Sequence, residues 1–385
     1  MSERRLHVLQ VTGTMNRGGA EVMLMDIFRN TGSEIRFDFL VQTKKKGLGA
    51  TGDFDDEIRA LGGRFFYIES QWDIGLIRYV RRFKKIIHEI GTPDVVHIHL
   101  NAKCGVIALA AKMCGIKKII AHSHAALNFT GPLLRVMPSK VELAIQRILI
   151  GWCATDYWGC SSAANRSLFN RRAFASKPPF ILSNAVDVRK FQAVDPKSRE
   201  SLRRNWGAGE RTLILGNVGR VVRHKKVDFI VEVLSVIKKK TPDVLMVFAG
   251  REDDEEFMAE IFRKAAEHSV KDAILHLGDR DDIPEIMSAM DVFVGPALNE
   301  GFGLVAAEAQ AAGVPCVLSN GFPELVDMDL NLVSFVSEYD AASWAAAIIG
   351  IKDKRCRDAE LISKRIAERG FDAVENTRRV ERLYR

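Results

Sequence analysis

Short apolar segments alternate along the chain with longer segments whose apolar residues recur every three or four positions. The short segments have the length of buried strands, and the longer ones have the spacing of amphipathic helices. Strands that alternate with helices predict a parallel α/β sheet. In the first part of the chain we expect strands at 6–12, 35–42, 65–68, 94–99, 117–121, 155–160 and 180–182, and helices at 19–30, 77–90, 103–114 and from 139 onward.

The same alternation restarts after a polar and charged stretch at 193–209. A chain of 385 residues favours two domains. We therefore expect a first domain at 1–190, a second at 191–370, and a C-terminal helix at 371–385. In the second domain we expect strands at 212–218, 244–249, 273–277 and 291–294, and helices at 227–240, 255–268 and 283–290.

Composition narrows the class of protein. The content of 47% hydrophobic and 27% charged residues is that of a soluble globular enzyme. No apolar run reaches ~18 residues, and the N-terminus enters a strand at once, so we expect neither a transmembrane span nor a signal peptide. The six cysteines show no metal-binding spacing and are expected to be reduced thiols, which fits a cytoplasmic protein.

The net charge of +7 is unevenly distributed. Residues 1–180 contain 26 lysines and arginines against 15 acidic residues, whereas the remainder contains 30 against 34. A basic N-terminal half favours an anionic partner there, such as a membrane surface or a phosphorylated acceptor. The alternative is a set of solvated basic faces. No nucleic-acid recognition motif is present, so we expect no nucleic-acid partner.

The stretch 295–320 carries the most distinctive pattern. It follows a short apolar run, and it contains Glu300 and Glu308 with a glycine-rich turn between them. A helix of about three turns is expected to begin at Leu304. The N-terminus of a helix suits a phosphate, because its backbone N–H groups are unpaired and carry partial positive charge. Two carboxylates would repel a diphosphate, so we expect them to bind uncharged sugar hydroxyls attached to it. The alternative is two solvated glutamates.

Two further features follow predicted strands in the first domain. Gly18 and Gly19 open a helix, and glycine there lets the backbone approach a ligand closely. They do not form G-x-G-x-x-G, so a nicotinamide-dinucleotide site is not expected. His124 comes just after a strand, at the carboxyl end where ligands bind in α/β sheets. His97 and His99 are expected to be satisfied histidines of the core.

A basic loop opens the second domain. Gly219 and Arg220 follow its first strand, and Lys225 comes five residues later. Departure of a nucleoside diphosphate leaves negative charge that fixed cations can stabilise. Arginine can bind phosphate through two bonds, and lysine adds a point charge. Lys226 stands beside Lys225 and leaves open which lysine points inward, although spacing favours Lys225.

Together these motifs resemble those of the retaining GT-B glycosyltransferases of the GT4 type, in the family's order and over nearly the whole chain. The matching elements are the E-x7-E motif (Glu300 and Glu308), the GGxE loop (Gly18 to Glu21), the GR-x4-K element (Gly219, Arg220 and Lys225) and the N-G-V-D-x3-F hinge (Asn184 to Phe191). Ala185 replaces the hinge glycine. If that position requires a positive φ, alanine costs roughly 1 kcal/mol there.

The resemblance implies a GT-B fold, with two facing Rossmann-like domains built on parallel sheets and a terminal helix that crosses back to the first domain. It implies a retaining glycosyltransferase that moves a sugar from a nucleoside-diphosphate donor, with UDP expected, to a glycan or lipid-linked acceptor. We expect no cofactor and no metal site, because protein cations replace a metal ion.

The resemblance also assigns roles to individual residues. Catalytic roles near the donor sugar and its diphosphate fall to Glu300, Arg220, Lys225 and His124. Donor-binding roles fall to Gly18, Gly19, Gly219, Arg280, Gly303, Leu304, Val305 and Glu308, with Glu308 at the ribose and Arg280 near the base.

Two other functions remain open, a non-catalytic sugar-nucleotide-binding protein of the same fold and a sugar-nucleotide epimerase. We also expect reversible docking of the first domain on the cytoplasmic membrane face. The basic charge and an apolar loop at 129–137, which carries Arg135, favour this contact. The alternative is that the loop packs in the core or lines the cleft.

Overall fold

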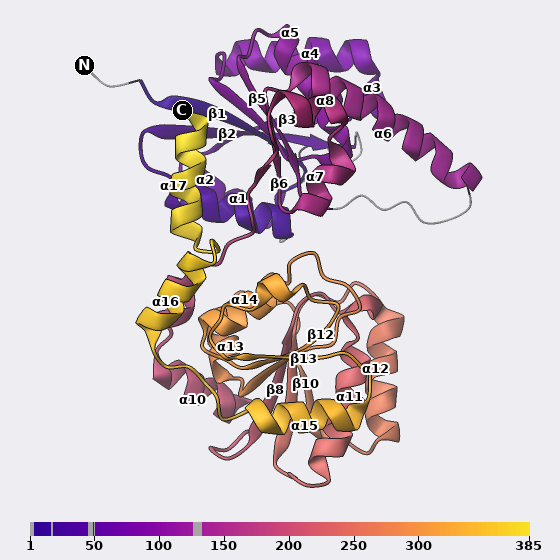
Figure 1. Cartoon of the computed structure of the whole chain (residues 1–385), viewed down its shortest axis with the longest axis vertical. Helices are drawn as coiled ribbons and strands as arrows, with labels where there is room; N and C mark the ends of the chain where they lie inside the picture. The colour runs from indigo at the N-terminus through magenta and orange to yellow at the C-terminus, as the bar shows by residue number, and fades with distance from the viewer. Residues whose placement is uncertain (1–3, 17, 45–48, 50, 126–132) are drawn as a thin grey trace. The chain divides into compact units, whose positions relative to one another are not determined.

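The computed structural model describes residues 4–16, 18–44, 49, 51–125 and 133–385 (Figure 1). The chain forms two compact units. Unit 1 comprises residues 1–185 and 373–385, and unit 2 comprises residues 186–372. The first boundary therefore falls five residues before the predicted one at 190/191. The C-terminal segment belongs to unit 1.

Unit 1 is built on a seven-stranded sheet in which all paired strands are parallel. The strand order is β3-β2-β1-β4-β5-β6-β7, so the chain runs outward from β1 in both directions. The strands are β1 (Leu6–Thr12), β2 (Ile35–Thr43), β3 (Arg64–Glu69), β4 (Val95–Ile98), β5 (Lys118–Ser123), β6 (Asp156–Gly159) and β7 (Phe180–Ile181).

Helices cover both faces of this sheet (Figure 1). On one face the core contains side chains of α4 (Leu76–Ile90), α5 (Cys104–Met113) and α6 (Leu133–Cys153). On the other face it contains side chains of α1 (Gly19–Asn30) and α17 (Ala373–Tyr384). The remaining α-helices in the described part of the unit are α2 (Asp55–Ala60), α3 (Gln71–Ile74), α7 (Ser162–Leu168) and α8 (Arg171–Ser176).

Unit 2 repeats this plan with a six-stranded parallel sheet of order β10-β9-β8-β11-β12-β13. This is the order of a Rossmann fold, and the direction of winding changes between β8 and β11. The strands are β8 (Leu213–Val218), β9 (Val244–Ala249), β10 (Ile274–His276), β11 (Val292–Gly295), β12 (Cys316–Ser319) and β13 (Val333–Val336).

The helices of unit 2 also form two layers. One core contains side chains of α11 (Val227–Lys238), α12 (Glu255–Glu267) and α15 (Ala341–Ile351). The other contains side chains of α9 (Val188–Gln192), α13 (Ile283–Ala289), α14 (Leu304–Ala311) and α16 (Ala359–Glu368), with α10 (Pro196–Asn205) packed on α13. The prediction of two Rossmann-like units with parallel sheets is confirmed.

The start of α6 differs from the prediction. Ser139 was expected to cap a helix, but α6 begins at Leu133, so Ser139 lies inside it. The capping signature was misleading because the helix continues upstream through Pro138. The predicted apolar loop at 129–137 is therefore helical from 133, and residues 129–132 lie outside the described part of the chain.

The structure also bears on the expectations for the hinge residue Ala185 and for a transmembrane span. Ala185 is not among the described residues with positive φ, so the hinge places no left-handed strain on it. In the described part of the chain, no helix combines the length and apolar character needed to cross a membrane.

Candidate functional site

The central site lies where the winding of the unit 2 sheet reverses. Ligands of open α/β sheets bind outside the carboxyl ends of the strands at such a point. Gly219 and Arg220 follow β8 directly, and the loop that carries Glu300 follows β11. The backbone N–H of Leu298 donates to the carbonyl oxygen of His224 at 2.8 Å, which ties the two loops together.

Lys225 and Glu300 form an ion pair at this point. A 3-10 turn (Arg223–Lys225) directs the lysine, and the backbone N–H of Glu300 is fixed by the carbonyl oxygen of Gly321 at 2.9 Å. The side chains of Lys225 and Glu300 are only 18% and 12% exposed. The structure therefore joins two residues that were predicted independently from two motifs.

The neighbouring Lys226 is used differently. Its φ is +54°, in the left-handed region that favours glycine. Its ammonium lies 3.4 Å from the carboxylate of Asp228, at the start of α11. Lys225 is thus the lysine that reaches Glu300, which answers the question that the sequence left open.

Gly303 ends the same loop with a φ of +83°, immediately before α14. A Cβ atom at Gly303 would lie 2.4 Å from Cδ1 of Phe322, so both conformation and space require glycine. The first-turn N–H groups at Leu304 and Val305 have no acceptor within the helix and carry partial positive charge. These N–H groups can donate hydrogen bonds to phosphate oxygens.

Glu308 lies one turn further along α14 and is half-buried. It shares a helix face with Leu304 four positions earlier. Arg220 is 57% exposed, and its guanidinium lies 3.3 Å from the carboxylate of Asp253. The guanidinium of Arg280 forms an ion pair with the carboxylate of Asp282 at 2.6 Å.

Backbone packing is close around Gly219. A Cβ atom at Gly250 would lie 1.9 Å from the carbonyl oxygen of Gly219. Both glycines have positive φ, +143° and +146°. The loop after β8 thus packs directly on the loop after β9, and sequence reasoning missed Gly250.

Gly18, Gly19 and His124 belong to unit 1. Gly18 is the N-cap of α1, and a Cβ atom there would lie 2.3 Å from Oε2 of Glu21. Burial raises the pKa of the Glu21 carboxyl. A Cβ atom on Gly19 would lie 4.0 Å from Nδ2 of Asn184, so the GGxE loop and the hinge asparagine meet within the unit.

His124 is part of a cluster of four histidines that sequence reasoning did not assemble. His97 and His122 lie in β4 and β5, and His99 and His124 lie just beyond those strands. Nε2 of His124 is 2.9 Å from Nδ1 of His99, and Nε2 of His97 is 3.1 Å from Nδ1 of His122. The signal was present, because HIH and HSH place alternate side chains on one face of neighbouring strands.

Burial holds the pKa of each of the four imidazoles below its usual range. For His124 it lowers the pKa to about 4. For His97, His99 and His122 the pKa lies well below the usual value, and neighbouring histidines lower it further. All four rings are therefore neutral near pH 7.

Three of these histidines come within reach of a common metal ion. One ring nitrogen from each of His97, His99 and His122 lies within 4.8 Å of the others. Zinc uses such ligand sets. Here, however, Nε2 of His97 is directed at Nδ1 of His122, and His99 bonds Gln10 and His124. Hydrogen bonds thus engage most ring nitrogens of the cluster, whereas Nε2 of His122 and Nδ1 of His124 have no partner among the described residues.

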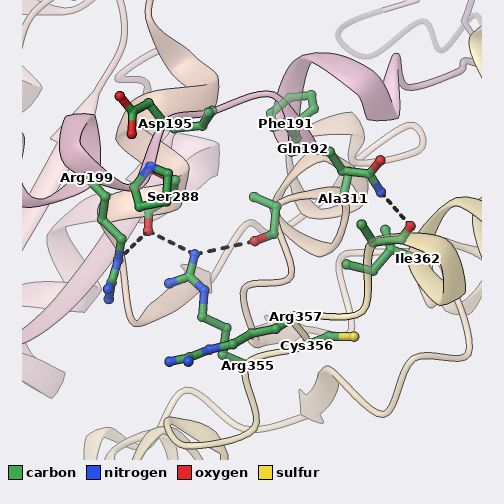
Figure 2. A pocket seen from close by; sticks show the side chains of 14 residues that line it. Phe191, Gln192, Asp195, Arg199, Ser288, Ala311, Arg355, Cys356, Arg357 and Ile362 are labelled. Carbon is green, nitrogen blue, oxygen red and sulfur yellow. Dashed lines mark hydrogen bonds between the residues drawn. The ribbon is translucent and has the colours of Figure 1, made fainter.

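A cavity elsewhere in unit 2 has a different character (Figure 2). This cavity of about 420 Å³ lies at the carboxyl end of α13, and Arg199 and Arg355 both donate to the carbonyl oxygen of Ser288 at 2.9 Å. Arg355 also donates to the carbonyl oxygen of Met290 at 2.9 Å. These arginines satisfy the last carbonyls of a helix, which is a structural task. None of the predicted site residues lines this cavity.

Comparison with known proteins agrees with this geometry. The family model described as "Glycosyl transferases group 1" matches residues 198–369, nearly all of unit 2. EpsF of Bacillus subtilis (strain 168) is 32% identical over 386 aligned residues, which cover 100% of this chain and 97% of EpsF. The UDP-Gal:alpha-D-GlcNAc-diphosphoundecaprenol alpha-1,3-galactosyltransferase of Escherichia coli is 26% identical and covers 91% of this chain and 89% of its own.

Solved structures show the same fold. Anabaena Alr3699/HepE in complex with UDP has a TM-score of 0.77 at 19% identity, over 98% of this chain and 99% of that one. Sucrose-phosphate synthase from Thermosynechococcus elongatus has a TM-score of 0.68 at 14% identity, over 98% of both chains. These neighbours have the GT-B fold. The chain is thus a glycosyltransferase, and it belongs to the family of group 1 glycosyl transferases.

Proposed function

We propose that this glycosyltransferase moves a sugar from a uridine diphosphate donor with retention at the anomeric carbon, and that protein cations replace a metal ion. The observation that carries the proposal is the shielded Lys225–Glu300 pair at the carboxyl edge of the unit 2 sheet. The pair places a cation and a carboxylate beside the start of α14. The cation and the helix start suit a diphosphate, and the carboxylate suits an uncharged sugar.

Each residue then has a separate task. Glu300 orients the donor sugar, and Glu308 holds the ribose. The first-turn N–H groups at Leu304 and Val305 bind phosphate. Lys225 meets the charge that grows on the leaving diphosphate, an interaction that strengthens in the transition state. The roles of further predicted residues follow the family pattern, with Arg220 and Gly219 at the diphosphate, Arg280 near the base, and Gly18, Gly19 and His124 toward the donor sugar and the acceptor.

The ion pair also affects the resting protein. A carboxylate and an ammonium that are largely shielded from water stabilise each other, because an unpaired charge at such a position raises the free energy of the folded protein. When the donor binds, the ammonium of Lys225 can contact the diphosphate. The carboxylate of Glu300 can then accept a hydrogen bond from a sugar hydroxyl. The pair thus holds both side chains in place until the donor replaces one partner.

The names of relatives support UDP as the nucleotide. The E. coli relative is named for UDP-Gal, and HepE has been crystallised with UDP-glucose. Other relatives, from Mycobacterium tuberculosis, are named as GDP-mannose-dependent. A change in thermal stability with UDP, GDP and ADP separates these donors, because only a ligand of the folded state raises the melting temperature.

We further propose a lipid-diphosphate-linked acceptor in the assembly of a bacterial polysaccharide, at the inner face of the membrane. The name of the E. coli relative contains diphosphoundecaprenol, and CapH of Staphylococcus aureus is named for capsular polysaccharide biosynthesis. Such an acceptor lies in a membrane with an anionic surface. Unit 1 has a helix face that suits binding to that surface.

That face is the outer side of α6. Its inner side is buried at Leu143, Gln146 and Ile150. Its outer side carries an apolar stripe at helical spacing, in which each side chain is 44–60% exposed: Met137, Val141, Ile145, Ile148 and Trp152. An exposed apolar stripe of this length marks an interaction surface.

Basic residues border the stripe. Lys140 lies within α6, and Arg171 and Arg172 lie on the adjacent α8. The guanidinium of Arg172 stacks on the ring of Trp152 at 4.6 Å. An apolar helix face with flanking cations suits an anionic membrane, at ~1 kcal/mol for each basic residue near the surface.

Turnover of labelled sugar nucleotides, measured by mass spectrometry with lipid-linked acceptors, tests the function. Transfer of the sugar to an acceptor is expected. Release of free sugar products without an acceptor would indicate an epimerase, and binding without turnover would indicate a non-catalytic binding protein. Either result would contradict the proposal.

A further inference from the structure

The four histidines of unit 1 belong to a hydrogen-bonded network that begins at the C-terminal helix. Nε2 of Gln10, in β1, donates to the hydroxyl of Tyr384 at 3.0 Å. That hydroxyl lies 2.7 Å from Nδ1 of His97, and Oε1 of Gln10 lies 2.8 Å from Nε2 of His99. Two branches therefore leave the Gln10–Tyr384 pair, one through His97 to His122 and the other through His99 to His124.

The branch through His99 fixes the proton on His124. Oε1 of Gln10 can only accept, so Nε2 of His99 carries a proton. A neutral His99 then has a lone pair on Nδ1 and accepts from Nε2 of His124. A neutral His124 that is protonated at Nε2 keeps a lone pair on Nδ1.

The branch through His97 runs with the opposite polarity. The hydroxyl oxygen of Tyr384 accepts from Gln10, so its proton goes to Nδ1 of His97. The proton of His97 is then on Nε2 and is donated to Nδ1 of His122. His122 is left with an N–H at Nε2.

Both branches end on a buried atom. Nε2 of His122 and Nδ1 of His124 are shielded from water, and neither has a hydrogen-bond partner among the described residues. A buried polar atom without a partner costs free energy, and a bound ligand can remove that cost. One branch thus presents a donor and the other an acceptor.

We propose that Tyr384 and Gln10 are positioning residues that hold His124 in the Nε2–H tautomer, so that Nδ1 accepts a hydroxyl of a bound substrate. The substrate contact rests on the proposed function, whereas the tautomer does not. Reversal of the Gln10 amide would invert every donor and acceptor in the network and place the proton of His124 on Nδ1. The Tyr384 hydroxyl matters because it is the acceptor that orients this amide.

The position of Tyr384 links the network to the C-terminal helix. It is the last residue of α17, in the segment that rejoins unit 1 after unit 2. Glu381 accepts from the backbone N–H of Gly32 at 2.7 Å, and Arg385 pairs with Glu34 at 2.7 Å, so α17 is anchored within unit 1. The docked C-terminal helix therefore sets the hydrogen-bonding state of His124.

Tyr384→Phe tests the proposal without loss of the ring. The ring stacks on Trp158 at 5.9 Å and contacts Phe37 edge-on, so phenylalanine can preserve the packing. Tyr79→Phe is the matched control. The hydroxyl of Tyr79 donates to Oε1 of Gln42 at 2.7 Å in the same unit, and neither of these residues bonds a histidine of the cluster.

The measurement is a long-range ¹H–¹⁵N correlation spectrum of the ¹⁵N-histidine-labelled full chain at pH 7.5. We expect one Nε2–H tautomer for His124 in the native protein and in Tyr79→Phe, and a mixture of both tautomers in Tyr384→Phe and Gln10→Leu. A native His124 protonated at Nδ1, or a Tyr384→Phe spectrum identical to the native one, would overturn the proposal.

Two further readouts separate the alternatives. In a transfer assay Tyr384→Phe should lower kcat in proportion to the fraction of His124 that leaves the Nε2–H tautomer, at unchanged donor KM. If the tautomer shifts while kcat does not, the positioning role holds and the substrate contact of His124 fails. Binding of one equivalent of Co²⁺, with visible absorption bands that His99→Gln abolishes, would show that the cluster is a metal site and would overturn the relay.

Discussion

The ammonium of Lys225 pairs with the carboxylate of Glu300, although 75 residues separate them in the chain. One follows β8 and the other follows β11, and these strands are neighbours in the unit 2 sheet. The pair therefore depends on the parallel topology, and it brings together the two charges on which the proposed chemistry relies.

Lys225→Ala should lower kcat by about 10²–10³-fold, because the charge that Lys225 meets grows as the glycosidic bond breaks. The Kd of the nucleotide should rise much less. The matched control is Lys226→Gly, which removes the adjacent charge and suits the left-handed backbone at that position. Steady-state kinetics and nucleotide titrations check this prediction. If rate and affinity fell in equal proportion, Lys225 would be only a binding residue.

Gly303→Ala should destabilise unit 2 by about 1–3 kcal/mol and weaken nucleotide binding. The new methyl group would meet Phe322, and the positive φ would be strained. Gly301→Ala is the control, because a Cβ atom there meets nothing within 4 Å and its φ is not in the left-handed region. Urea unfolding with and without UDP measures both effects. Equal stability of the two variants would contradict the account of Gly303.

Acid should destabilise the protein through the histidine cluster. An unfolded histidine binds a proton below pH ~6.5. The folded cluster resists protonation, and the pKa of His124 is about 4. The unfolded state therefore binds more protons between these values, and stability falls as the pH falls through this window. Between pH 7.5 and 5.5 we expect a loss of roughly 1 kcal/mol for each of the four histidines.

The free energy of unfolding, measured by urea titration across this pH range, checks the acid effect. His122→Asn should reduce the slope of stability against pH by one proton. A native slope no steeper than that of His122→Asn would show that His122 takes no part in the effect.

Membrane docking should depend on the outer face of α6. The triple change of Ile145, Ile148 and Trp152 to serine should abolish co-sedimentation with anionic vesicles, because it removes the apolar contact. Serine at Ile349 and Leu361, two exposed apolar residues of unit 2, should leave binding unchanged. Binding should also weaken with salt. Equal binding to neutral vesicles, or no binding at low salt, would exclude this contact.

The sequence predicted the elements best where a single pattern dominates. The bounds of β1 (Leu6–Thr12) and α1 (Gly19–Asn30) agree with the expectation, because an apolar run and then an amphipathic repeat are each bordered by polar residues or glycine. The predicted start of α6 was wrong because the capping pattern at Ser139 is purely local, whereas the helix begins at Leu133 and continues through Pro138.

The site was predictable only in part, for a similar reason. Motifs mark residues near one another in the chain, so Lys225 and Glu300 were found separately, and their pairing needed the fold. His97 and His99 were correctly expected in the core, but their partners Gln10 and Tyr384 lie 89 or more residues from them along the chain. No local pattern in the sequence links these residues, and the sheet register and the docked helix bring them together.

The most direct test of the central claim is the stereochemistry of transfer without metal. Enzyme treated with EDTA should move the sugar from its UDP donor to a lipid-linked acceptor, and NMR of the product should show the anomeric configuration of the donor. Lys225→Ala should lose nearly all of this activity under the same conditions. An inverted product, or activity that vanishes with EDTA and returns with a divalent metal, would contradict the account.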